Sequence, residues 1–189
     1  MGFDMDIYIT ALKNALERSS LIYEQLENGD FSSVVCDMSG QYDYGGEYDI
    51  NGLERTRLAY YMMMLPAEDI SADMLERLMR EEISARKQDS YQGVGDALRI
   101  FTALLRRYGK GEYQSLFDEA RSANSDCECG YAPENCDNIL KERIDDYPPE
   151  SCISALDYLG FDDEAAELSK LYADKSADNN IENLYKAEE

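Results

Sequence analysis

The stretch VGDALRIFTALLRRY, residues 94–108, is the clearest indicator of the fold. Its apolar residues recur at spacings of three and four, the period of a helix with one buried face. The residues expected to face the interior are Ala97, Leu98, Phe101, Leu104, Leu105 and Tyr108. Gly109 follows at once and provides a helix stop. We therefore predict a helix over 94–108.

The same period continues on both sides of this stretch. It predicts helices over 7–26 and 52–65, another beginning near Ser71, and one over 112–123. After a loop at 124–133, shorter helices are predicted over 134–146, 149–159 and 162–174, with a final turn at 180–187. A chain of 189 residues has the size of one ordinary domain, so we predict a single all-α domain spanning 1–189.

One segment resembles a known helical repeat. The sequence LDYLGFDDEAAEL, residues 156–168, is similar to the turn inside a tetratricopeptide-type helical hairpin. Comparable turns occur at Gly29, Gly109 and Gly160, but these glycines lie 80 and 51 residues apart, whereas such an array needs a constant period of about 34. The pattern therefore indicates antiparallel helical hairpins, arranged either as an irregular helical bundle or as a short irregular solenoid.

The segment CDMSGQYDYGGEYDIN, residues 36–51, departs from the helical pattern and contains no lysine or arginine. Tyrosines and carboxylates alternate on both sides of a Gly-Gly pair, which predicts a small β-hairpin with a two-residue turn at about 40–50. One face would carry tyrosines and the other carboxylates, a combination that suits protein binding. The alternative is a tyrosine-rich loop folded onto the helices. The candidate contact residues are Tyr42, Asp43, Tyr44, Glu47, Tyr48 and Asp49.

The charge of the chain is strongly negative. It has 40 acidic residues, 18 basic residues and no histidine, for a net charge of −22. The field of such a chain repels phosphate backbones and anionic lipids, so neither nucleic acid nor membrane is expected as a partner. A basic protein is favoured instead.

The negative charge is concentrated at the two ends. Residues 1–50 hold 10 acidic and 2 basic residues, residues 51–124 hold 12 and 11, and residues 125–189 hold 18 and 5. In the near-neutral middle, surface pairs such as Glu76 with Arg80 and Glu82 with Arg86 are expected. An alternative purpose for the acidic ends is solubility.

Four acidic residues near predicted helix ends are further candidates for partner binding. Their expected roles are helix capping, which acidic residues favour at a helix start, or contact with a basic partner. They are Asp145, Asp146, Asp162 and Asp163.

Catalysis has little support in the sequence. Without histidine, the common general base and nucleophile activator are missing, so no enzyme activity and no cofactor are expected. Cys127, Cys129 and Cys136 do not have the spacing of a zinc knuckle, so no metal is expected. Free thiols are favoured, with metal binding or disulfides left as alternatives. The acidic N-terminus is unlike a secretory signal, and the longest apolar run, 58–65, is too short to cross a bilayer, so a cytoplasmic location is expected.

Three functions fit these observations. The first is an acidic helical inhibitor, above all an immunity protein that neutralises a basic, nuclease-type bacterial toxin by blocking its active-site cleft. The second is a DNA mimic whose carboxylates replace phosphates on a DNA-binding protein. The third is a helical-repeat adaptor that binds peptides.

Overall fold

The computed structural model describes residues 5–89, 93–108, 111–141 and 143–186, the last eleven of these by their backbone only. The described chain is mostly α-helical with one two-stranded antiparallel sheet, so the predicted all-α class and the small β-hairpin are confirmed. The chain divides into two compact units. The central unit is Arg18–Glu142, and the terminal unit combines Met1–Glu17 with Arg143–Glu189. A single domain over 1–189 stays a prediction.

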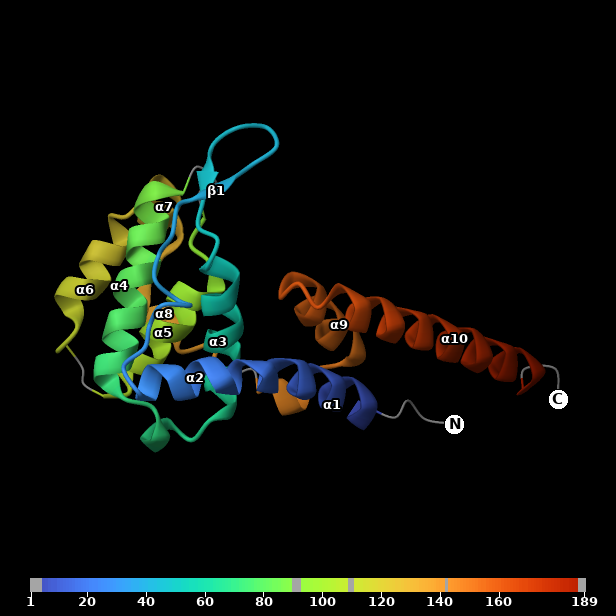
Figure 1. The fold of residues 1–189 in the computed structure, drawn as a ribbon. Helices are drawn as coiled ribbons and strands as arrows, with labels where there is room; N and C mark the ends of the chain where they lie inside the picture. The colour runs from blue at the N-terminus through green and yellow to red at the C-terminus, as the bar shows by residue number, and fades with distance from the viewer. Residues whose placement is uncertain (1–4, 90–92, 109–110, 142, 187–189) are drawn as a thin grey trace. The chain divides into compact units, whose positions relative to one another are not determined.

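The central unit is built around α5, Asp96–Arg106, which packs against α3 (Gly52–Met64), α4 (Ala72–Gln88) and α8 (Pro133–Cys136) (Figure 1). Most of α5 is buried, including the five predicted core residues between Ala97 and Leu105. This arrangement around one helix is that of an irregular bundle. The other elements of the unit are η1 (Glu17–Ser19, which begins in the terminal unit), α2 (Ser20–Glu27), β1 (Gly40–Gln41), β2 (Glu47–Tyr48), η2 (Ala67–Asp69), α6 (Gln114–Arg121) and α7 (Ser125–Gly130).

The terminal unit consists of α1 (Met5–Leu16), η3 (Ile144–Asp146), α9 (Pro149–Tyr158) and α10 (Asp162–Lys186). Helix α9 packs against both α1 and α10 (Figure 1). The ring of Tyr8, which is fully buried, meets Tyr172 edge to face at 6.3 Å between centroids. Among the described residues, no helix has both the length and the apolar character needed to cross a membrane.

Several predicted boundaries were wrong. The helix predicted over 7–26 is broken by η1, where the chain passes from the terminal to the central unit. The loop predicted at 124–133 contains α7, which Asn124 caps by accepting a hydrogen bond from the Cys127 amide at 2.7 Å. The helix predicted over 134–146 is limited to the single turn α8 and the 3-10 turn η3.

The last helix is longer than predicted. It begins at Asp162, as expected after Gly160, but continues to Lys186 and includes most of the turn predicted at 180–187. Residue 187 and the predicted stop Gly109 lie outside the described residues. Tyr108 was predicted to face the core but is 40% exposed, and its hydroxyl donates to the Ala67 carbonyl at 2.8 Å.

Candidate protein-binding hairpin

The hairpin of the central unit has a longer loop than the Gly-Gly pair predicts. Gly40 pairs with Tyr48 and Gln41 with Glu47, so residues 42–46 form the loop. The Tyr42 amide donates to the Gly46 carbonyl at 3.1 Å and closes it. This register is offset by three positions from a two-residue turn at Gly45-Gly46, so the predicted turn is wrong. The observed pairing leaves Tyr48 on the same side of the ribbon as Tyr42 and places Glu47 on the other side, in line with the predicted tyrosine and carboxylate faces.

The three tyrosines of the hairpin form one aromatic cluster. The Tyr42 ring stacks on Tyr44, with centroids 5.0 Å apart and planes 13° apart, and lies 4.8 Å from the Tyr48 ring. The Tyr48 ring in turn covers Gly40, where an added Cβ would lie only 2.6 Å from it. Tyr44 ends the stack and is 76% exposed. The hairpin therefore presents a supported aromatic side chain to solvent, at the loop that projects beyond the helices of the central unit (Figure 1).

The inner end of this cluster is held by a polar contact. The Tyr42 hydroxyl donates to the Asp89 carboxylate at 3.4 Å. Burial and then the nearby Asp89 charge raise the pKa of Tyr42 above its ordinary value, so this hydroxyl stays protonated at neutral pH.

The carboxylates of the hairpin have two different roles. Asp43 and Glu47 are exposed beside the tyrosines. Asp49, by contrast, is only 7% exposed and is bound to the Arg55 guanidinium. The prediction that Asp49 contacts a partner therefore does not match its place in the structure, where its carboxylate is used for internal hydrogen bonds.

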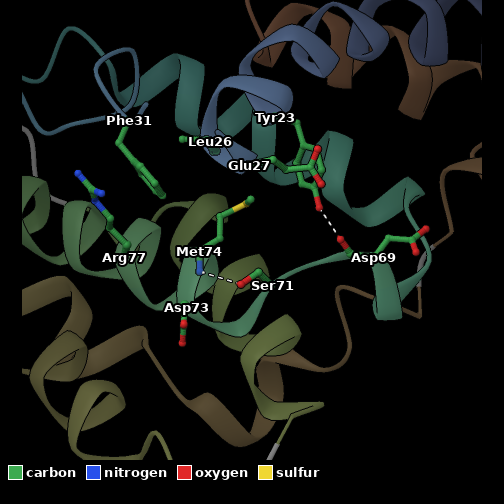
Figure 2. A pocket seen from close by; sticks show the side chains of 9 residues that line it. All are labelled: Tyr23, Leu26, Glu27, Phe31, Asp69, Ser71, Asp73, Met74 and Arg77. Carbon is green, nitrogen blue, oxygen red and sulfur yellow. Dashed lines mark hydrogen bonds between the residues drawn. The ribbon is translucent and has the colours of Figure 1, made fainter. Parts of the chain in front are cut away.

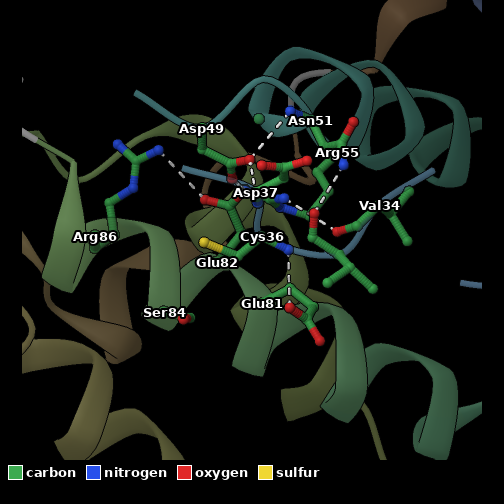
Figure 3. Close-up of polar contacts among 12 residues, drawn as sticks. Val34, Cys36, Asp37, Asp49, Asn51, Arg55, Glu81, Glu82, Ser84 and Arg86 are labelled. Atoms are coloured by element: carbon green, nitrogen blue, oxygen red, sulfur yellow. Dashed lines mark hydrogen bonds and ion pairs between the residues drawn. The ribbon is translucent and has the colours of Figure 1, made fainter. Parts of the chain in front are cut away.

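A buried arginine anchors the segment that carries the hairpin. Arg55, on α3, has no exposed surface and donates to three acceptors: the Glu82 carboxylate at 2.7 Å, the Val34 carbonyl at 3.0 Å, and Asp49 (Figure 3). Burial alone would lower the pKa of Arg55, but the attraction of Glu82 and Asp49 outweighs it and raises that pKa. The guanidinium stays charged inside the unit.

Asp49 extends this network into the hairpin segment. Its Oδ1 accepts hydrogen bonds from the Asp37 amide at 2.9 Å and the Asn51 amide at 3.0 Å (Figure 3). The Cys36 amide donates to Glu81 at 2.9 Å. The residues on both sides of the hairpin are thus tied to α3 and α4, which makes the loop a preorganised rather than a loose element.

The surface pairs predicted for the middle of the chain are confirmed in part. Glu76 and Arg80 form an exposed ion pair at 2.6 Å. Glu82 and Arg86 also pair, at 3.6 Å, but Glu82 is buried and its other oxygen accepts from Arg55. Sequence reasoning missed Arg55. It stands three and seven residues before the buried Leu58 and Met62, a spacing that places it on the same inner face of α3.

The other four candidate residues belong to the terminal unit. Asp145 and Asp146 are exposed in η3, and Asp162 and Asp163 are exposed in the first turn of α10. Asp145 is paired with Lys13, whose hydrogen bond lowers the pKa of this carboxyl, and with Arg143. The structure therefore divides the candidates into a hairpin group and a terminal group, each on its own unit.

The two units carry equal net charge on unequal lengths. The terminal unit has 16 acidic and 5 basic residues, and the central unit has 24 and 13, so each has a net charge of −11. The terminal unit, with 64 of the 189 residues, therefore has about twice the charge per residue.

The cysteines do not gather into a metal site. All five are free thiols, and among the described residues no three potential ligands lie close enough to hold an ion. Cys127 and Cys136 are buried, whereas Cys129 is exposed. Burial raises the pKa of Cys136 to about 11, so its thiol is protonated and unreactive at neutral pH.

Comparisons with known proteins identify no relative of this chain. No protein-family model matches the chain, and neither the curated proteins nor the solved structures contain a significant match to it.

Proposed function

We propose that the protein binds a basic partner protein through the hairpin of residues 40–48, and that it acts as an inhibitor of that partner. The observation that carries this proposal is the stack of tyrosines ending in the exposed Tyr44, beside the exposed carboxylates of Asp43 and Glu47. Tyrosine provides a large contact area at low entropic cost, and carboxylates select arginine and lysine.

The anchoring of the hairpin supports a binding role. A loop that is already ordered loses less conformational entropy on association, so more of the contact energy appears as affinity. Arg55, Asp49 and Glu82 provide this order from inside the unit. The net charge of −22 adds long-range attraction to a cationic surface and speeds association at low salt.

Among basic partners, we favour a nuclease-type toxin domain, because such a domain needs positive charge around its cleft to hold a phosphate backbone. The protein would then be a cytoplasmic immunity protein that covers this cleft. This function needs neither a catalytic residue nor a cofactor in the inhibitor itself.

The experiment begins with capture from an extract of the parent organism at low salt, followed by purification of the retained protein. Its dissociation constant is then measured for the wild type and for Asp43→Asn/Glu47→Gln. The matched control is Glu24→Gln/Asp118→Asn, which removes the same two charges from exposed helical positions of the same unit. We expect the hairpin variant to associate more slowly with the partner than the wild type does, and its dissociation constant to depend less on salt, whereas the control should match the wild type.

A second variant tests the aromatic anchor. Tyr44→Ser removes the exposed end of the stack and should weaken binding by at least about tenfold, as expected for a central tyrosine of an interface. Equal affinity of the wild type and both hairpin variants for the partner would exclude the hairpin as the binding surface. Displacement by duplex DNA would favour a DNA mimic, and binding to many short peptides would favour an adaptor.

A further inference from the structure

A groove opens in the central unit between the end of α2 and the start of α4 (Figure 2). Its volume is about 450 Å³, which lies within the range of roughly 300–1,000 Å³ typical of ligand sites. The groove is open to solvent and shares no residue with the hairpin.

The floor of the groove is apolar and already formed. Leu26, Phe31 and Met74 are buried and line it, together with the ring of Tyr23 (Figure 2). The Tyr23 hydroxyl donates to the Asp69 carbonyl at 2.6 Å, which fixes the ring in place. A ligand would therefore meet a preformed surface of aromatic, aliphatic and thioether groups.

The rim of the groove is mainly negative. Three of its lining residues, Glu27, Asp69 and Asp73, are exposed acids, against one basic residue, Arg77. Figure 2 shows the Glu27 carboxylate beside the Tyr23 ring, whereas the carboxylates of Asp69 and Asp73 point away from the floor. Burial raises the pKa of Tyr23 to about 12, and the charges of Glu27 and Asp69 act in the same direction. The field at the floor therefore opposes negative charge.

Arg77 shows how a guanidinium fits this surface. Its carbon Cζ lies 3.7 Å from the centroid of the Phe31 ring, as in a cation–π contact. An anionic ligand is disfavoured by the three carboxylates. It would also find the Met74 amide of the α4 N-terminus already donating to the Ser71 hydroxyl (Figure 2).

We propose that the groove binds an arginine-bearing peptide segment of a partner protein. The aliphatic stem of the arginine would lie on the apolar floor, and its planar guanidinium would meet the Glu27 carboxylate at the rim, which arginine engages better than lysine does. A peptide suits the groove because an open site can accept an extended chain along its length. This site is independent of the hairpin.

The test is a titration of the intact protein with Nα-acetyl-arginine-N-methylamide, followed by amide chemical shifts. We expect saturable shifts confined to residues 23–31 and 69–77, with a dissociation constant on the order of 1 mM. The Glu27→Gln/Asp73→Asn variant should bind roughly fivefold to tenfold more weakly. The control Glu24→Gln/Asp118→Asn should bind as the wild type does.

The acetyl-norleucine and acetyl-aspartate methylamides serve as comparison compounds. Equal binding of the norleucine compound, stronger binding of the aspartate compound, or shifts that do not saturate would each overturn the proposal. The wild-type titration decides the question even if the double variant fails to fold.

Discussion

Replacing Arg55 by methionine should destabilise the central unit strongly. The substitution removes a guanidinium that has no exposed surface and leaves Asp49 and Glu82, with side chains 2% and 1% exposed, without their counter-charge. It also leaves the Val34 carbonyl without the hydrogen bond from Arg55. Breaking a buried ion pair from one side costs about 3–5 kcal/mol, so we expect a loss of this size in the free energy of unfolding.

The assay is urea unfolding followed by circular dichroism, since urea does not screen ion pairs as guanidinium chloride does. The matched control is Arg80→Met, which breaks the exposed pair with Glu76 and should cost no more than about 1 kcal/mol. Neutralising both partners, in Arg55→Met/Asp49→Asn/Glu82→Gln, should recover part of the loss. A loss at Arg55 no larger than the loss at Arg80 would refute the reasoning.

Three further predictions concern single side chains. The Tyr23→Phe variant should lose about 1 kcal/mol in the free energy of unfolding at pH 8, because it lacks the hydroxyl that donates to the Asp69 carbonyl. The folded-state pKa of Tyr23 is about 12, above the ordinary 10, so its contribution to the free energy of unfolding is complete below pH 10 and declines as the pH rises towards 12. The urea midpoint should therefore fall less steeply between pH 10 and 12 in the variant than in the wild type. At pH 8, iodoacetamide should modify Cys129 first, and Cys136 and Cys152 only on unfolding; mass spectrometry showing equal rates would contradict their burial. Ser71→Ala should cost about 0.5–1 kcal/mol in urea unfolding, because it removes the cap of α4; an unchanged midpoint would argue against the cap.

The helices were predictable where local sequence and packing agree. The apolar stripe of α5, the serine cap of α4 and the glycine before α10 each correspond to an observed helix face or boundary. The length of the hairpin loop was not predictable, because the strand register depends on contacts outside the Gly-Gly pair. The Tyr48 ring packs over Gly40, and Asp49 turns inward to Arg55.

The proposed binding surfaces show the same limit. The exposed acids and Tyr44 follow from composition, since a segment rich in tyrosine and acid and free of basic residues stands out in the sequence. The difference between the buried Asp49 and the exposed Asp43 and Glu47 does not follow from composition, because Asp49 is buried by its contact with Arg55, six residues further along the chain. The groove could not be predicted either, since its walls come from α2 and α4, which only the fold brings together.

The central claim is that the hairpin is the surface that binds a basic partner protein. The most direct measurement is the dissociation constant of the purified partner at low and at physiological salt, for the wild type, Asp43→Asn/Glu47→Gln and the control Glu24→Gln/Asp118→Asn. We predict that the hairpin variant binds more weakly and with less salt dependence, whereas the control follows the wild type. Identical affinities and salt dependences for all three proteins would contradict the account.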